Sequence, residues 1–180
     1  MTKKYILTGG PGIGKTTILK LLSGNGLYII NETATYLIEK ELKKPEKEQI
    51  VPWTNPQEFQ RKVYENQRRW EEEIPKGIER ALLDRSLADN LAYLKLNNLE
   101  GTKVYRDIKK YASENRYEKI FLLDQLPFKE ETAIRRDTEI AGKIHELIQE
   151  TYKDLGDKLE RIPVLEPKER AEFVYRQIHK

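Results

Sequence analysis

Residues 9–16 have the types and the spacing of a phosphate-binding loop: a glycine, four residues, a second glycine, a lysine and a threonine. The glycines let the backbone take positive φ and approach a ligand closely, so that several N–H groups can converge on a phosphate at a helix N-terminus. Lys15 would bridge the β- and γ-phosphates of a nucleotide, and the hydroxyl of Thr16 would bind Mg²⁺. The chemistry that these residues could support is the binding and transfer of phosphoryl groups.

The sequence on either side of this loop predicts the strand and the helix that a phosphate-binding loop requires. Residues 5–8 form a short β-branched and aromatic run typical of a buried strand. After the loop, Ile18, Leu21 and Leu22 are spaced to lie on one face of a helix. The residues that we expect to contact the nucleotide are Gly10, Gly12, Ile13, Gly14, Lys15, Thr16 and Thr17.

The rest of the chain alternates predicted strands with predicted helices. Further strands are predicted at 27–30, 81–85, 120–124 and 159–164, and further helices at 34–42, 55–74, 87–94, 102–111, 140–155 and 167–178. This alternation predicts an α/β fold in which helices cover both faces of a five-stranded parallel sheet. A chain of 180 residues fits one domain. The charged stretch around 128–138 has little to bury, and we expect it to form a mobile lid.

Charged residues follow several of the predicted strands, at the edge of the sheet where ligands of open parallel sheets bind. They are Glu32, Asp84 with Arg85, and Asp124. Asp84 ends an apolar strand, which is the form of the second nucleotide-binding motif, whose carboxylate holds Mg²⁺ through water. Asp124 ends a strand of the same form, so both aspartates are metal candidates. The neighbouring Arg85 favours Asp84.

The order of these motifs resembles the P-loop nucleoside and nucleotide kinases. The shared features are the phosphate loop, a glutamate after the second strand, an Asp-Arg pair after the third, and paired arginines before a long helix. Deoxynucleoside kinases, thymidylate kinase and nicotinamide riboside kinase are the nearest examples. Asp84-Arg85 with Asp89, and Tyr152 near the end of the long helix, also look like a group of small predicted ATPases related to those kinases. The resemblance covers the whole chain and implies a P-loop NTPase fold.

The resemblance implies a role for each matching residue. Glu32 would accept the proton of a substrate hydroxyl, unless Asp84 serves as that base. Asp84 would serve the metal or the substrate hydroxyl, and Arg85 would bind a substrate or stabilise the transferring phosphate. Arg135 and Arg136 would belong to a lid that closes over ATP.

Residues 55–74 are where we expect the phosphoryl acceptor, beside Phe59, Gln67 and Trp70. Gln67 interrupts an apolar helical stripe, so it either lies at the edge of the stripe or faces a polar ligand; the edge is the preferred interpretation. Thr33 follows Glu32 where the kinases commonly have proline, which is a departure from their pattern.

Two functions are compatible with these residues. The first is an enzyme, a kinase that transfers the γ-phosphoryl group of ATP, with Mg²⁺, to a small metabolite such as a nucleoside or nucleotide. The alternative is a P-loop NTPase or GTP-binding switch that acts on a protein partner. The chain has no Asn-Lys-x-Asp sequence, the usual guanine-reading motif of P-loop GTPases. The choice between ATP and GTP stays open.

The composition excludes several other kinds of site. No cysteine is present, and His145 and His179 are the only histidines, so disulfides, thiol nucleophiles and cysteine- or histidine-rich metal sites are excluded. We expect both histidines to be exposed to solvent. The net charge of +3 offers no case for nucleic-acid binding. The abundance of Glu, Lys and Arg resembles that of proteins from heat-loving organisms.

The N-terminus and the hydropathy pattern predict a cytoplasmic location. Residues 1–4 lead directly into the first predicted strand, with no apolar leader between them. No run reaches the roughly 18 apolar residues of a membrane span. We therefore expect small-molecule partners rather than a membrane or a nucleic acid.

Overall fold

A parallel β-sheet forms the centre of the computed structural model, which describes residues 2–125 and 140–180. Its strands are β1 (Lys3–Thr8), β2 (Tyr28–Ile30), β3 (Arg80–Asp84), β4 (Lys119–Leu123) and β5 (Leu159–Ile162). Among the described residues the strand order is β2-β3-β1-β4-β5, and every neighbouring pair is parallel. The predicted α/β fold with a five-stranded parallel sheet is confirmed. The predicted lid at 128–138, with Arg135 and Arg136, lies outside the described residues.

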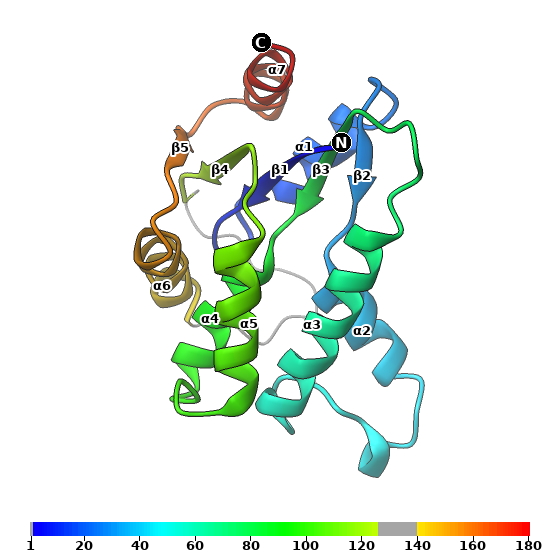
Figure 1. Cartoon of the computed structure of the whole chain (residues 1–180), viewed down its shortest axis with the longest axis vertical. Coiled ribbons are helices and arrows are strands. Elements are labelled where there is room, and N and C mark those ends of the chain that lie inside the picture. Colours follow the sequence, from blue (N-terminus) through cyan, green and yellow to red (C-terminus); the bar gives the residue numbers. More distant parts are fainter. Residues whose placement is uncertain (1, 126–139) are drawn as a thin grey trace.

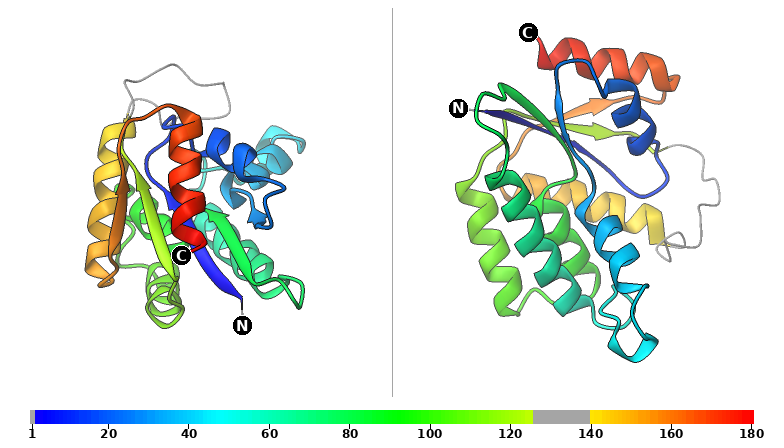
Figure 2. Two further views of the ribbon diagram at one scale, coloured as in Figure 1. Left: turned by 90° about the horizontal axis from the view of Figure 1, so that it is seen from above. Right: turned by 90° about the vertical axis from the view of Figure 1, so that its right-hand side faces the viewer.

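Helices cover both faces of the sheet (Figure 1). They are α1 (Lys15–Leu22), α2 (Thr33–Glu41), α3 (Pro56–Glu72), α4 (Leu87–Leu96), α5 (Lys103–Glu114), α6 (Ala141–Asp154) and α7 (Pro167–Ile178), with a short 3-10 helix at Glu46–Glu48. Figure 2 shows α1 and α7 on one side of the sheet and α4, α5 and α6 on the other. Within the described ranges, no helix combines the length and the apolar character that crossing a membrane demands.

The two faces of the sheet have separate apolar cores because successive strand residues point in opposite directions. Leu7 and Leu82 pack with the apolar side chains of α1 and α7, whereas their neighbours Ile6 and Leu83 pack with those of α4 and α6. All four side chains are fully buried. Because these strands are buried on both faces, their sequences are nearly continuous apolar runs.

The register of β1 and β3 brings two predicted functional segments together. Leu7 of β1 lies opposite Asp84 of β3, and the N–H of Arg85 donates to the Leu7 carbonyl oxygen at 3.0 Å. The loop that follows β1 and the Asp84-Arg85 pair that follows β3 are therefore neighbours at the carboxyl edge of the sheet.

Glu41 holds the long segment between α2 and α3 in place. Its buried carboxylate accepts hydrogen bonds from Lys44 Nζ at 2.7 Å, from Lys62 Nζ at 2.8 Å and from the Ile50 N–H at 3.0 Å. Burial opposes the charged form, but the hydrogen bonds from Lys44, Lys62 and Ile50 lower the pKa of Glu41 to about 2. This carboxylate thus fastens the segment that carries Trp53 to α3.

Candidate active site

The phosphate loop joins β1 to α1 and has a backbone that its glycines make possible. Gly9, Gly12 and Gly14 have φ angles of 133°, 72° and 90°, which residues with a side chain rarely adopt. A Cβ atom at Gly9 would also meet Ile13 Cδ1 and would lie 3.1 Å from the backbone carbonyl oxygen of Leu123. The loop therefore needs glycine at this position for space as well as for conformation.

Lys15 lies across the concave side of this loop. Its Nζ donates to the carbonyl oxygen of Gly10 at 2.8 Å and to that of Gly9 at 3.3 Å, and the residue is buried. Gly14 precedes the first residue of α1 without a side-chain cap. The first N–H groups of α1 therefore point toward the loop, where an anion can accept their hydrogen bonds. The loop and Lys15 fit a bound polyphosphate.

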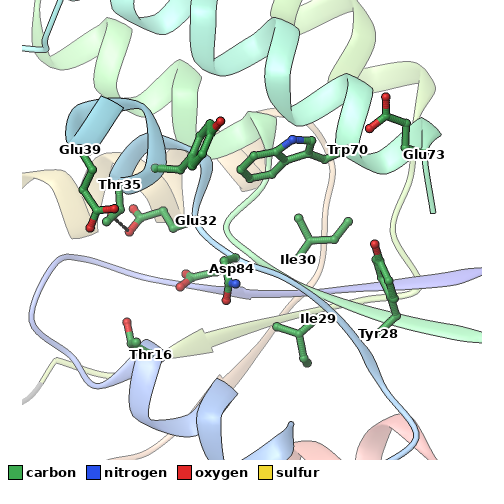
Figure 3. Close-up of a pocket in the computed structure, with 12 residues that line it drawn as sticks. Thr16, Tyr28, Ile29, Ile30, Glu32, Thr35, Glu39, Trp70, Glu73 and Asp84 are labelled. Carbon is green, nitrogen blue, oxygen red and sulfur yellow. Dashed lines mark hydrogen bonds between the residues drawn. The ribbon is translucent and has the colours of Figure 1, made fainter. Parts of the chain in front are cut away.

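Thr16 and Asp84 line the same cavity of about 560 Å³, which we call the edge cavity because it lies beside the edge strand β2. Figure 3 shows Asp84 between Thr16 and Glu32. The residues that line the edge cavity are Thr16, Tyr28, Ile29, Ile30, Asn31, Glu32, Thr35, Tyr36, Glu39, Trp70, Glu73 and Asp84. A hydroxyl and a carboxylate are hard oxygen donors, and Mg²⁺ at a phosphate site takes one or two such groups together with phosphate oxygens and water. Thr16 and Asp84 fit this set of donors.

Asp124, the other metal candidate, lies on the opposite side of β1 at the end of β4. Its Oδ1 accepts hydrogen bonds from Arg161, from Nε at 3.0 Å and from Nη2 at 2.8 Å. It is not among the residues that line the edge cavity. The structure thus brings Asp84, and not Asp124, together with Thr16.

Arg85 connects the phosphate loop to the residues after β2 and β3. Its Nε donates to Glu32 Oε1 at 2.6 Å, and its Nη1 donates to the Gly9 carbonyl oxygen at 2.9 Å and to Asp89 Oδ1 at 3.0 Å. The φ angle of Arg85 is 71°, in the left-handed region. Such a conformation is costly for arginine and persists where the surroundings hold the residue in place. Here the contacts on Glu32, Gly9 and Asp89 do so.

The guanidinium of Arg85 is charged although it is buried. Burial by itself would lower its pKa, but the Tyr93 hydroxyl and the nearby carboxylates Glu32 and Asp89 raise the pKa of Arg85 well above its usual value. Its Nη2 is buried and has no hydrogen-bond partner within the described part of the chain. One N–H edge of this cation is therefore available to a ligand.

Asp89 is a buried carboxylate to which sequence reasoning assigned no role in the site. Oδ1 accepts hydrogen bonds from the Thr8 hydroxyl and Arg85, and Oδ2 accepts from the Ser86 N–H at 3.0 Å and the Tyr152 hydroxyl at 2.7 Å. Burial and the charge of Asp89 raise the pKa of Tyr152 well above its usual value, so its phenol keeps the proton that it donates. Two sequence features pointed to Asp89: the resemblance that includes Asp89 and Tyr152, and the capping box that Asp89 forms with Ser86.

A second cavity of about 450 Å³, which we call the helical cavity, is lined mainly by residues of α2, α3 and α4. It shares Glu32 and Asp84 with the edge cavity. Its lining residues are Glu32, Thr33, Ala34, Ile38, Pro52, Trp53, Phe59, Gln60, Val63, Gln67, Asp84, Arg85, Ser86, Asp89, Asn90, Tyr93, Leu96, Asn97, Ile140 and Lys143. Of the predicted acceptor-site residues, Phe59 and Gln67 line the helical cavity, whereas Trp70 lines the edge cavity.

Gln67 is buried, so the preferred interpretation that it lies at the edge of an apolar stripe is wrong. Only 3% of the residue is exposed, and its amide is satisfied within the protein: Gln67 Oε1 accepts from the Thr33 hydroxyl and its Nε2 donates to Glu71 Oε1 at 3.1 Å. Thr33 supplies the hydroxyl that donates to Gln67, and proline at this position would have no such group. The pair ties the start of α2 to α3 beside the helical cavity.

Asn90 is a residue of the helical cavity that no sequence motif indicated. It is 6% exposed, and its Nδ2 has no hydrogen-bond partner among residues 2–125 and 140–180. A buried amide without a partner is costly, and here it faces a cavity large enough for a metabolite. Asn90 therefore offers a hydrogen-bond donor to a ligand.

His145 is also placed differently from the expectation. The prediction that it is exposed is wrong, because it is 4% exposed and its Nδ1 accepts a hydrogen bond from the Gly10 N–H at 3.1 Å. The polar residues next to His145 in the sequence suggested an exposed position. The contact with Gly10 forms between residues 135 positions apart, so the local sequence did not indicate it.

Comparison with known proteins identifies the family of the chain and solved structures with a similar fold. A protein-family model described as an AAA domain matches residues 4–170, and a search of curated proteins gives no match. A NadR protein in complex with NR aligns at 16% identity and a TM-score of 0.75, over 99% of this chain and 50% of that one. This chain thus spans half the length of the NadR chain.

Two kinases of similar length align over nearly their whole chains. Thymidylate kinase from Ehrlichia chaffeensis aligns at 13% identity and a TM-score of 0.63, over 98% of both chains. Deoxyadenosine kinase from M. mycoides, with the products dCMP and dCDP bound, aligns at 18% identity and a TM-score of 0.63, again over 98% of both. These likenesses confirm the predicted resemblance to P-loop kinases at the level of the fold.

Proposed function

Because the chain belongs to the AAA domain family and has the fold of P-loop kinases, we propose that it is a kinase that transfers the γ-phosphoryl group of ATP to a hydroxyl group of a small metabolite. The observation that carries this proposal is the position of Arg85. It donates to Gly9 in the phosphate loop and to Glu32, and it lines the helical cavity. A loop suited to a nucleotide and a cavity suited to a metabolite thus meet at one ion pair.

The nucleotide half of the site consists of the loop and the two oxygen donors beside it. The N–H groups of residues 12–16 and the ammonium of Lys15 would hold the phosphates. Thr16 and Asp84 would hold Mg²⁺, which supplies positive charge against the oxygens of the transferred group. The same residues would hold GTP, so the loop does not decide between adenine and guanine nucleotides.

The transfer step requires a proton acceptor and a cation near the reacting atoms. The acceptor hydroxyl oxygen would form a bond to the γ-phosphorus, the bond from that phosphorus to the bridging oxygen of ADP would break, and the hydroxyl proton would pass to Glu32. The Arg85 Nε and the Thr35 hydroxyl at 2.8 Å hold the two oxygens of Glu32 in position. Asp84, which also lines the helical cavity, is the alternative base.

The charges of the helical cavity favour a hydroxyl acceptor without a phosphate. Within the described lining, the carboxylates Glu32, Asp84 and Asp89 outnumber the cations Arg85 and Lys143. Arg85 is already paired with Glu32 and Asp89. The net negative charge of this lining would repel a phosphate on the acceptor, whereas it would not repel a neutral molecule.

The remaining lining favours a flat acceptor of nucleoside size. Trp53, Phe59 and Tyr93 provide aromatic walls, and Asn90 provides a buried donor for a carbonyl oxygen or a ring nitrogen. The volume of about 450 Å³ lies within the range of small-molecule sites. A nucleoside is the class of metabolite that combines these features.

A matched panel of acceptors tests the proposal. The full chain is incubated with ATP and Mg²⁺ together with nucleosides or their monophosphates, and ADP release and product mass are followed. We expect nucleosides, and not monophosphates, to raise ADP release and to gain one phosphoryl group. Tight nucleotide binding and slow hydrolysis that no acceptor accelerates would instead support the NTPase or GTP-binding switch. Replacing ATP with GTP tests the nucleotide preference.

A further inference from the structure

His145 contacts the phosphate loop from outside, through the first turns of α6. Its Nδ1 accepts a hydrogen bond from the backbone N–H of Gly10 at 3.1 Å, and the residue is 4% exposed. An Nδ1 atom that accepts must carry no proton, so the neutral tautomer bears its proton on Nε2. The contact therefore requires an uncharged imidazole.

Gly10 lets α6 approach the loop closely enough for this bond. A Cβ atom at Gly10 would lie 3.2 Å from His145 Cβ and 3.1 Å from the carbonyl oxygen of Ala141, both in α6. Any side chain at this position would push the helix and the loop apart. The glycine and the histidine thus form one contact at the start of the phosphate loop, next to residues 12–16, whose N–H groups would bind phosphate.

The charged groups around His145 favour its neutral form. Burial lowers its pKa, and so do Arg161 in β5 and Lys15 in α1. Asp124 after β4 and Glu146 in α6 oppose this shift, and the net effect is a pKa below the usual value of 6.5. The imidazole is therefore neutral at neutral pH, as the hydrogen bond from Gly10 requires.

We infer that His145 is a positioning residue of the nucleotide site: its neutral imidazole holds the Gly10 N–H and thereby keeps the first turn of the phosphate loop in the shape that receives a nucleotide. The inference rests on the proposed binding of a nucleotide by this loop. Protonation of Nδ1 removes the acceptor and places a cation against an N–H donor and near Lys15. The contact is present above the lowered pKa of His145 and is lost as the pH falls through it.

Substitutions of the two histidines test this role, with ADP and Mg²⁺ as the probe in titration calorimetry. His145→Leu removes the acceptor and leaves a buried N–H without a partner, so we expect ADP binding to weaken about 10-fold at neutral pH. His145→Asn places an amide oxygen near the position of Nδ1, so we expect it to restore affinity to within about threefold. His179→Asn changes the other, exposed histidine and is the matched control.

The pH profile separates positioning from a merely structural role. Between about pH 8 and about pH 5, the wild type should lose ADP affinity more steeply than His145→Asn. Of the two side chains at position 145, only the imidazole titrates in this range. The titration of ADP itself is common to both proteins and cancels in the comparison. In the free chain, the NMR signal of the Gly10 amide should shift with the same midpoint as the His145 ring.

The outcomes distinguish this inference from the proposed function. If the wild type binds ADP and a folded His145→Leu variant binds it equally well, or if the wild type and His145→Asn have the same pH profile, the positioning role is wrong. If the wild type binds neither ADP nor ATP, the proposed function fails, and the positioning role fails with it. Circular dichroism and thermal unfolding report whether each variant is folded.

Discussion

The phosphate loop and the helical cavity meet at Arg85, but they are built in opposite ways. The loop consists of consecutive residues, and its shape follows from backbone conformations that glycine permits, with φ angles of 133° at Gly9 and 90° at Gly14. The helical cavity is assembled from α2, α3, α4 and the segment that Glu41 fastens, and its polar groups are side chains. One region presents main-chain donors to a ligand, and the other presents side chains.

This difference predicts which substitutions affect which substrate. Main-chain donors recognise any polyphosphate of the right shape, so changes in the loop should reduce the reaction with every acceptor. Under the proposed function, side chains of the cavity would recognise one acceptor, so changes there should alter discrimination between acceptors while nucleotide binding persists. Arg85 and Glu32 lie at the border, where both effects should combine.

Lys15→Ala should have the largest effect. Removal of the ammonium from the concave side of the loop should lower turnover by about 10³-fold with every acceptor, because no other side chain in the loop carries a positive charge. ADP release and product mass measure the loss, and thermal unfolding should show an intact fold. Normal turnover in this variant would refute the assignment of the phosphate loop.

Glu32→Gln should have the next largest effect. Glutamine keeps a hydrogen-bonding group beside Arg85 but cannot accept the hydroxyl proton, so kcat should fall about 10²-fold while ADP binding stays within a few-fold of the wild type. Glu39→Gln is the matched control, since Glu39 lines the same edge cavity from an exposed position. An unchanged kcat in Glu32→Gln would move the role of base to Asp84.

Asn90→Leu should have the smallest and most selective effect. It removes the buried donor of the helical cavity, so KM for the acceptor should rise about 10-fold while KM for ATP stays unchanged. Asn97→Ala is the control, because the Asn97 amide already donates to the Tyr93 carbonyl oxygen at 2.8 Å. Equal changes in both KM values would show that the cavity and the loop are not separate recognition regions.

Most of the fold could be predicted from the sequence because its signals are local. Apolar runs and helical periodicity indicated the five strands and the α-helices among the described residues but not the 3-10 helix at Glu46–Glu48, and the carboxyl-edge rule placed Glu32, Asp84 and Arg85 near the phosphate loop. Arg85 favoured Asp84 over Asp124 as the partner of Thr16, but the strand patterns alone did not exclude Asp124. Both end apolar strands, and only the strand order separates them across β1.

The amino-acid sequence by itself determined the phosphate loop, because eight consecutive residues contain all the flexibility and charge that its shape requires. The tertiary structure decided the surroundings of the loop. Asp89 meets Tyr152 and Gly10 meets His145 across 63 and 135 positions of the chain. Such contacts depend on how α4 and α6 pack against the sheet, and helical periodicity indicates which face is buried but not which side chain it will meet.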